Sequence, residues 1–471
     1  MKLTYLRTKF YVKTSLKLTF GIFCVFFICW LILSGLAALF HPKLYGSREI
    51  LFIALGFSVL SAVLLRSIIE FSHMFVFYIV NFPLYWISSV IPVQRRLWIF
   101  GSRQGTSFSE NPKHLYLYLC EQRPEIKALW VTKKWSVLRE LKGRGLPCVY
   151  AYSPAGYYYS ARAECVFFSH TKKTITDFND YVTTRKTIRV QLWHGTPMKK
   201  IGTESPRQKF RAFELLVGKV FRSLFPFLNN RFGYDKFLAP SIETSKSFKS
   251  AFNLSDIDFL FCGYPKNDVW LARSSQPVIR KRRRVVYMPT WRNSDWVDDF
   301  QLVRDYEFSI QRLEEFCEIN SIDFFFRFHP YAMRKMQSFA TEVSRFQRVH
   351  IENTEDIYET LDTFDILISD YSSVIFDYLL SGRPVIYAWF DFDSYREKEG
   401  FFYESKDVVA GTVAYNWLEI EEQLELCLSG LTEGKERRSQ INQRFNEFHS
   451  SNNSERLCSL IELIVPMPSA D

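Results

Sequence analysis

The stretch DILISDYSSVIFDYLLSGRPVIYAWFDFDSY, from Asp365 to Tyr395, decides the fold class because two strand patterns flank one helix pattern. The apolar runs Asp365 to Ile368 and Val385 to Phe390 are typical of buried strands in a parallel sheet. Between them, Val374 to Leu380 is amphipathic, as a helix that covers such a sheet must be. A strand, a helix and a second strand in this order predict an α/β fold with a parallel sheet.

The polar residues of this stretch are concentrated in the turn between the first strand and the helix. Ser372 and Ser373 stand where they can cap the helix, and Asp370 enters the same turn. Hydroxyl and backbone N–H groups at a helix start, on the carboxyl edge of a strand, suit phosphate binding in open α/β sheets. We therefore interpret the turn as a diphosphate site; the alternative is an ordinary capped turn. Asp377, inside the helix, would repel a phosphate and is expected to stabilise the helix start.

The composition describes a folded protein with unevenly distributed positive charge. Of 471 residues, 47% are apolar and 17% aromatic, which excludes a disordered chain. The formal net charge is +10, but residues 1–100 hold ten Lys and Arg against two Glu and so carry +8 of it. This distribution argues against a nucleic-acid partner. The nine cysteines form no CxxC pair or metal-ligand spacing, as expected in a reducing cytosol.

The N-terminal region, residues 1–96, is predicted to anchor the chain in a membrane. Leu18 to Phe40 contains 23 residues without a charge, enough to span a bilayer, and the basic residues before it keep the N-terminus cytoplasmic. A second apolar run, Ile50 to Ile69, returns the chain to the cytosol. A cleaved signal peptide is the alternative for the first run, but that run is too long and lacks a small-residue cleavage site.

The third hydrophobic stretch, Phe71 to Val93, is interpreted as a segment that lies in the membrane interface. Its Tyr and Trp residues suit headgroup depth, and Arg95 and Arg96 follow it toward the anionic leaflet. If the rest of the chain uses an activated nucleotide donor, it must lie in the cytosol, and a cytoplasmic N-terminus then requires an even number of spans. Two spans and one interfacial segment meet this condition. We expect a protein of the cytoplasmic membrane whose catalytic domains face the cytosol.

From Leu97 onward, short apolar runs alternate with amphipathic stretches, which predicts two parallel α/β domains. We expect domains at 97–262 and 285–431, a solvated linker with the basic run RKRRR at 263–284, and a helical segment at 432–471. The expected strands are Leu97–Phe100, Ala128–Val131, Cys148–Tyr150, Cys165–Ser169, Ile188–Trp193, Phe237–Leu238, Val285–Met288 and Phe324–Phe328, besides the two already given. The expected helices include His114–Cys120, Trp135–Gly143, Ser309–Asn320 and Lys435–Ile464.

Two histidines directly follow apolar strands. His194, in QLWHGTPMKKIG from Gln191 to Gly202, stands before a Gly/Pro turn, and His329, in FFFRFHP, ends another strand. A histidine titrates near neutral pH, so it can accept the proton of an attacking alcohol or bind a phosphate. Strand ends from two domains can face each other across a cleft. The alternative for each histidine is a structural position at the start of a loop.

Other polar residues repeat this pattern. Lys199, just beyond His194, would stabilise anionic oxygens, and Thr290 and Arg292, which end the strand in YMPTWR, could bind phosphate. The segment GYPKND, Gly263 to Asp268, is a turn pattern whose lysine and asparagine are weaker candidates.

These motifs, in this order, resemble the CDP-glycerol glycerophosphotransferase family of teichoic-acid and related polyol-phosphate synthesis. The residues that carry the resemblance are WHGTPMKKIG at Trp193–Gly202, GYPKND at Gly263–Asp268, PTWR at Pro289–Arg292, RFHP at Arg327–Pro330 and SDYSSVIFDY at Ser369–Tyr378. FGSRQGTSFSENPKHLY, Phe100–Tyr116, looks like the opening segment of the family. The resemblance covers roughly Leu97 to Ile464 and leaves residues 1–96 outside.

The resemblance implies a GT-B architecture, in which the active site lies between two Rossmann-like domains, and a CDP-glycerol or CDP-ribitol donor. By position, His194 and His329 would be the catalytic histidines. The implied donor- or phosphate-binding residues are Gly195, Thr196, Lys199, Thr290, Arg292, Arg327, Asp370, Ser372 and Ser373. Lys266 stands where the family usually has arginine; lysine keeps the charge but loses the planar fork.

The implied reaction is in-line attack of an acceptor hydroxyl on the phosphorus that bears the polyol, with CMP leaving. His194 would be the general base, while His329, Arg327 and the serine turn would stabilise phosphate charge. The acceptor would be lipid-linked or polymeric, and no tightly bound cofactor is expected beyond a divalent cation on the donor diphosphate. The alternatives are a membrane-anchored GT-B glycosyltransferase that uses a nucleotide sugar and a non-catalytic membrane scaffold of the same fold.

Overall fold

The structure, a computed structural model, describes residues 87, 90–170, 183, 186–206, 234–274, 280–290, 292, 304–329, 332, 336–430 and 434–465. Residues Ser88–Asp471 form one compact unit, distinct from Met1–Ile87. Both predicted membrane spans and most of the predicted interfacial segment lie outside the described residues. Among the residues that are described, no helix is long and apolar enough to cross a bilayer.

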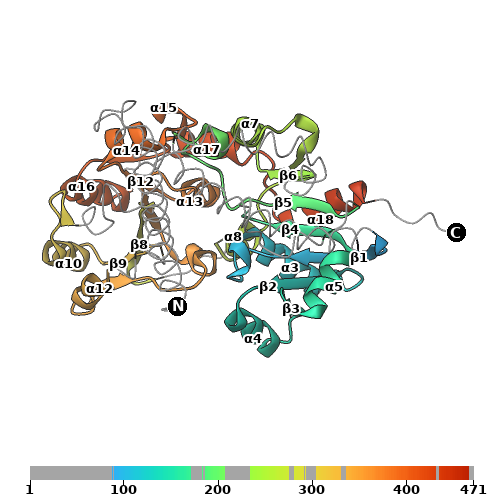
Figure 1. The fold of residues 1–471 in the computed structure, drawn as a ribbon. Helices are drawn as coiled ribbons and strands as arrows, with labels where there is room; N and C mark the ends of the chain where they lie inside the picture. Colours follow the sequence, from blue (N-terminus) through green and yellow to red (C-terminus); the bar gives the residue numbers. More distant parts are fainter. Residues whose placement is uncertain are drawn as a thin grey trace, which may run out of the picture. The chain divides into compact units, whose positions relative to one another are not determined.

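The first half of the compact unit contains a seven-stranded parallel sheet in the order β3-β2-β1-β4-β5-β6-β7 (Figure 1). Its strands are β1 (Gln94–Phe100), β2 (Lys127–Thr132), β3 (Cys148–Tyr150), β4 (Ala163–Phe168), β5 (Ile188–Gln191), β6 (Lys236–Ala239) and β7 (Phe259–Phe261). The α-helices described between and after these strands are α3 (Glu110–Gln122), α4 (Trp135–Gly143), α5 (Pro154–Arg162), α7 (Ile242–Phe252) and α8 (Lys266–Ser274).

The second half contains a six-stranded parallel sheet in the order β10-β9-β8-β11-β12-β13. Its strands are β8 (Arg283–Met288), β9 (Ile322–Phe326), β10 (Val349–Ile351), β11 (Ile366–Ser369), β12 (Val385–Ala388) and β13 (Thr412–Ala414). The described α-helices are α10 (Ile310–Ile319), α12 (Gln337–Val343), α13 (Val374–Tyr378), α14 (Phe392–Glu399), α15 (Ser405–Val408), α16 (Trp417–Leu428), α17 (Lys435–Phe445) and α18 (Asn453–Ile464).

Both sheets have the strand order of a Rossmann-like fold, in which the chain starts in the middle, winds one way and then crosses to the other side. The crossing falls between β1 and β4 in the first sheet and between β8 and β11 in the second. In such sheets ligands bind beyond the carboxyl ends of the strands, at this crossing. The prediction of an α/β fold with two Rossmann-like parallel sheets is confirmed.

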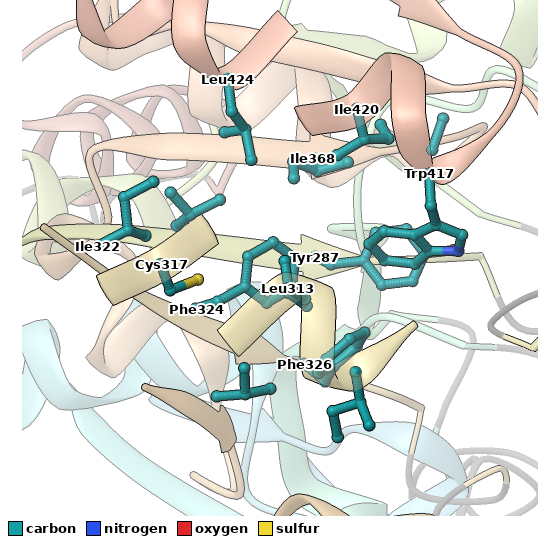
Figure 2. Close-up of a cluster of buried hydrophobic side chains, with 14 of the residues drawn as sticks. Tyr287, Leu313, Cys317, Ile322, Phe324, Phe326, Ile368, Trp417, Ile420 and Leu424 are labelled. Atoms are coloured by element: carbon teal, nitrogen blue, oxygen red, sulfur yellow. The ribbon is translucent and has the colours of Figure 1, made fainter. Parts of the chain in front are cut away.

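A dense aromatic core fixes the second sheet against its helices. Tyr287 on β8 and Trp417 on α16 pack with their ring centroids 5.1 Å apart. Figure 2 shows both side chains in a buried cluster that also holds Leu313 of α10 and Leu424 of α16. Burial of each large apolar side chain is worth roughly 1.5–3 kcal/mol relative to exposure. This packing holds the carboxyl ends of β8, β9 and β11 in fixed positions.

The last helix of the chain returns to the first sheet. Leu457, Cys458 and Ile461 of α18 belong to the same buried cluster as Trp98 on β1. Asp268, in the first turn of α8, accepts hydrogen bonds from the backbone N–H groups of Asn453 and Ser454 at the start of α18 (3.0 and 2.8 Å). These contacts satisfy N–H groups that a helix start leaves without partners.

In the segment expected to be a solvated linker, 263–284, the described residues 263–274 and 280–284 are packed instead. It contains α8, whose Trp270 is fully buried, and β8 begins inside its basic run. The Arg282 guanidinium donates to the carbonyl oxygen of Cys317 (2.8 Å), and that of Arg284 lies over the ring of Phe325 (4.3 Å). The apolar parts of these arginine side chains can cover sheet residues while each guanidinium interacts with a carbonyl oxygen or an aromatic ring. A count of charges along the sequence does not reveal such packing.

Candidate functional site

The turn that carries His194 and the serine turn touch each other. Gly195 follows β5 in the first half, and Ser373 precedes α13 in the second. A Cβ atom on Gly195 would lie 2.7 Å from Oγ and 2.9 Å from Cβ of Ser373, and the φ of Gly195 is +153°. Glycine is required here both for the backbone conformation and for the close approach. The structure therefore brings together the two motifs that the sequence predicted to form the site.

Backbone hydrogen bonds tie the segment beyond His194 to the second half. The N–H of Lys200 donates to the carbonyl oxygen of Gly400, and that of Phe402 donates to that of Met198, both at 3.0 Å. Lys199 lies between them in an antiparallel bridge with Phe401. The predicted phosphate residue Lys199 is thus held by its backbone where the two halves meet.

His194 lies in a strained and crowded turn. Trp193 just before it has a φ of +51°, a left-handed conformation that costs a non-glycine residue about 1–2 kcal/mol. Nδ1 of His194 lies 3.5 Å from the carbonyl oxygen of Ser169, which favours a proton on Nδ1 and leaves Nε2 as the proton acceptor. The ring of His170 stacks on that of His194, with centroids 4.3 Å apart and planes at 9°.

A carboxylate lies beside this pair of rings. Glu110, the first residue of α3, accepts a hydrogen bond from Nε of Arg103 (2.8 Å), and Oε2 lies 3.3 Å from Nδ1 of His170. Burial works to raise the pKa of Glu110, but the charges of His170 and Arg103 prevail and hold it well below its usual value. The group is therefore an anion at neutral pH.

Both predicted catalytic histidines have lowered pKa values, which differs from the near-neutral value expected from sequence. Burial, the charge of His170 and that of Lys266 lower the pKa of His194 to about 3. Burial, with the charges of Arg103 and Arg327, lowers the pKa of His329 to about 4. The charge of Glu110 opposes both shifts, so this one carboxylate lies within electrostatic reach of both histidines. Both rings are neutral at pH 7.

The serine turn exposes its hydroxyl groups. Ser372 and Ser373 are both partly exposed, and the Ser373 side chain makes no capping hydrogen bond. Oγ of Ser372 accepts only a long one, 3.5 Å, from the N–H of Val374. Because α13 has only five residues, its dipole adds little, and the side chains are the main polar groups that the turn offers.

Three other predicted phosphate residues are engaged with one another. The guanidinium of Arg292 pairs with Asp370 (2.6 Å) and Asp391 (2.8 Å) and is almost completely buried. The backbone N–H and the hydroxyl of Thr290 both donate to Asp370 (2.8 and 2.6 Å). These contacts join the ends of β8, β11 and β12. In this structure Arg292, Thr290 and Asp370 therefore hold one another in place at the start of the serine turn.

Lys266 is buried at the centre of the interface, in the first turn of α8 and not in the turn that its sequence suggests. Its ammonium donates to the carbonyl oxygen of His194 (2.8 Å), to the hydroxyl of Tyr358 (2.6 Å) and to Asp377 (2.8 Å). Asp377 lies in the first turn of α13, as expected for a residue that stabilises the helix start, and it also stabilises the contact between the two halves. The lysine side chain thus contacts the backbone of the turn that carries His194.

The remaining predicted residues lie around the same site. Arg327 donates to the carbonyl oxygen of Glu352 (3.2 Å) and stays partly exposed. Thr196 is buried, and its hydroxyl has no hydrogen-bond partner among the described residues. No group of three His, Cys, Asp or Glu side chains in the described part of the chain is arranged to hold a metal ion.

Sequence reasoning missed two members of the site. His170 follows the end of β4, and Glu110 opens α3 after β1, so both stand beyond strand ends on either side of the crossing in the first sheet. The rule that singled out His194, a polar residue directly after a buried strand, applies equally to His170. Glu110 gave no such signal, because the loop Gly101–Ser109 separates it from its strand.

Two Rossmann-like sheets whose strand-end turns meet define the class: an α/β protein with a ligand site between two such domains. A family model described as "CDP-Glycerol:Poly(glycerophosphate) glycerophosphotransferase" matches residues 83–463. Since that match covers most of the chain, the protein belongs to the CDP-glycerol glycerophosphotransferase family. The resemblance predicted from the motifs is confirmed.

Individual relatives agree with this membership. The chain is 25% identical over 382 residues to a teichoic acid glycerol-phosphate transferase of Staphylococcus aureus, over 78% of this chain and 93% of the relative. It is 27% identical over 346 residues to a teichoic acid poly(glycerol phosphate) polymerase of Bacillus subtilis, but this match spans 70% of the chain and only 43% of that longer relative. Among solved structures, the wall teichoic acid polymerase TagF superposes with a TM-score of 0.63 at 20% identity, over 84% of this chain and 96% of that one, which shows the shared fold.

Proposed function

We propose that this enzyme transfers glycerol phosphate from CDP-glycerol to a hydroxyl group of a lipid-linked or polymeric acceptor, in the synthesis of a teichoic-acid-like polymer. The observation that carries the proposal is the contact between Gly195 and Ser373, which joins the histidine turn to the serine turn within a chain of this family. The family and the transferase of Staphylococcus aureus support the same reaction. CDP-ribitol is the alternative donor.

In the proposed reaction, an acceptor oxygen attacks the phosphorus that bears the glycerol. The new P–O bond forms as the bond to the CMP oxygen breaks, and the acceptor proton passes to Nε2 of His194. His329, Arg327 and the hydroxyls of Ser372 and Ser373 stabilise charge on the phosphate oxygens, which carries most of phosphoryl-transfer catalysis. A divalent cation would share that charge on the donor diphosphate.

The low pKa of His194 suits a site that binds an anion. A neutral imidazole is ready to accept a proton, but a base with a pKa of about 3 is weak. The donor diphosphate would bring negative charge next to the ring, and a nearby negative charge raises the pKa of a histidine. Donor binding would thus strengthen the base at the moment it is needed.

We also propose that the region before β1, residues 1–93, anchors the enzyme in the cytoplasmic membrane, with spans at Leu18–Phe40 and Ile50–Ile69 and the catalytic domains in the cytosol. The structure places Gln94, Arg95 and Arg96, which were expected to belong to the anchor, in β1. The apolar runs and the basic residues before them support this topology. Cysteine-accessibility mapping near Arg95 tests it: labelling from outside the cell would contradict the proposal.

The activity is tested with membranes that contain the full chain, supplied with radiolabelled CDP-glycerol or CDP-ribitol and a lipid-linked acceptor. Release of CMP and a larger labelled lipid product are expected. Release of a nucleoside diphosphate from a nucleotide sugar would identify a glycosyltransferase, and donor binding without transfer would identify a scaffold. Alanine at His194 or His329 is expected to lower kcat by roughly 10²-fold or more.

A further inference from the structure

His170 and Glu110 form a pair beside His194 that the reaction as proposed does not use. Nδ1 of His170 lies 3.3 Å from Oε2 of Glu110 and 3.0 Å from the hydroxyl of Ser169. The face of the His170 ring stacks on that of His194: the two rings are nearly parallel, and their centroids are 4.3 Å apart. One imidazole thus connects a buried carboxylate to the predicted general base.

The carboxylate is held in place at a conformational cost. Glu110 has a φ of +67°, and Arg103 and Gln104 in the same loop have φ values of +44° and +63°. Left-handed backbone at non-glycine residues persists only where surrounding contacts impose it, and such residues cluster at functional sites. Here the hydroxyl of Ser102 (3.4 Å) and Nε of Arg103 (2.8 Å) both donate to Glu110 and fix its direction.

Charge explains what this arrangement does. An imidazole next to a carboxylate favours its protonated form, whereas two protonated rings stacked face to face repel each other. A proton on His170 is therefore stabilised by Glu110 and excludes a proton from His194. Burial is the largest cause of the lowered pKa of His194, and Lys266 of α8 acts in the same direction as His170, whereas the charge of Glu110 itself opposes them. Trp193 packs on the ring without charge.

We propose that His170, fixed by Glu110, is a positioning residue that keeps His194 neutral and sets the orientation of its ring. This inference rests on the proposed function, because it concerns the base of that reaction. His170 holds no substrate atom in this scheme. It prepares His194 to accept the acceptor proton at acidic as well as neutral pH.

The test measures the protonation of His194 without relying on activity. Diethyl pyrocarbonate modifies an imidazole only when that imidazole is neutral, so the modification rate of His194 reports the fraction of His194 that is neutral. The rate is read by peptide mass spectrometry on the full chain between pH 5.5 and 8. In the wild type, the rate normalised to that at pH 8 is expected to stay within twofold. In His170→Phe, which keeps a stacked ring without charge, it is expected to fall at least threefold at pH 5.5.

Further variants separate charge from shape. His170→Arg keeps a cation and a planar group beside Glu110, so its profile is expected to match the wild type. Glu110→Gln removes the partner of His170 together with a charge that itself raises the pKa of His194, so its profile is expected to fall less than that of His170→Phe. His170→Leu, which removes the charge and the ring, decides the matter if His170→Phe does not fold. His350→Asn, which removes a histidine on β10 at the edge of the second sheet, is the matched control and should leave the profile unchanged.

The same variants are assayed for CDP-glycerol-dependent transfer across this pH range. A fall in kcat/KM toward pH 5.5 in His170→Phe that His170→Arg rescues supports the inference. A flat modification profile in both His170→Phe and His170→Leu would overturn it, even if activity falls. A wild type with the expected modification profile but no transfer would contradict the proposed function alone, so the two failures are distinguishable.

Discussion

The ammonium group of Lys266 lies 2.8 Å from the carboxylate of Asp377, and neither side chain is exposed to solvent (0% and 1%). The pair joins α8, which follows the first sheet, to α13 of the second. Because Lys266 also donates to the carbonyl oxygen of His194, one buried ion pair connects the domain interface to the catalytic turn.

Removal of one member of this pair should destabilise the protein strongly. Lys266→Met leaves Asp377 buried without its cation, a change that typically costs about 3–5 kcal/mol. Chemical unfolding of the unit Ser88–Asp471, followed in the full chain, would measure it. Lys246→Met, which breaks an exposed pair with Glu243, is the control and should cost about 1 kcal/mol or less. Equal losses for both variants would refute a central role of the buried pair.

Gly195→Ala should impair the reaction, because its Cβ would collide with Ser373 and push the two turns apart. We expect kcat/KM for CDP-glycerol to fall by roughly tenfold to 10²-fold, since small displacements of reacting groups are costly. The matched control is Gly382→Ala, whose φ is +69° but whose Cβ would meet no atom within 4 Å. That variant should lose about 1–2 kcal/mol of stability and keep its activity. Normal kinetics for Gly195→Ala would contradict the close approach.

The serine turn should act on donor binding. Ser372→Ala and Ser373→Ala each remove a hydroxyl that would donate to a charged phosphate oxygen, a bond worth about 1.5–3 kcal/mol. We expect the Kd or KM for CDP-glycerol to rise about tenfold or more in each variant, with unfolding unchanged. Ser381→Ala, a serine at the end of the same helical segment that donates to the carbonyl oxygen of Tyr378, is the control. Unchanged donor affinity in both turn variants would remove the diphosphate assignment.

Stability should fall as the pH drops from about 6.5 to 4. The folded-state pKa values of His194 (about 3) and His329 (about 4) lie below the unfolded value near 6.5, and those of His350 and His449 are also lowered. In this window the unfolded chain binds more protons than the folded one, so acid favours unfolding. His194 alone should account for about 2 kcal/mol between pH 7 and pH 5.

Thermal unfolding of the full chain across this pH range would show the loss. His194→Asn removes one titrating group, so its curve should be flatter than that of the wild type. A wild-type stability that does not change between pH 6.5 and 4 would show that these histidines titrate normally in the folded state.

Much of the sheet could be predicted because buried parallel strands are marked by short apolar runs. Cys148–Tyr150 and Trp135–Gly143 match β3 and α4 at both ends, and Val285–Met288 lies within β8. The edge strands β7, β10 and β13, of three residues each, were missed, since so short a run carries a weak pattern. The equally short edge strand β3 was predicted.

The site was predictable where chemistry coincided with a strand end. His194 and Ser373 met this condition, and the structure brings their turns into contact. Arg292 and Asp370 met it too, yet they pair with each other. A sequence reveals that two polar residues stand at neighbouring strand ends; it does not reveal whether opposite charges there will face a ligand or neutralise each other.

The return of α18 to the first sheet has a consequence for how the protein is made. The core around Trp98 is closed by Leu457 and Ile461, which the ribosome delivers only after the whole second sheet has been translated. Until then the first sheet emerges with part of its apolar face uncovered. Truncation near the C-terminus would therefore damage the first domain, so a nonsense mutation after α17 should yield an aggregating chain and not a shortened enzyme.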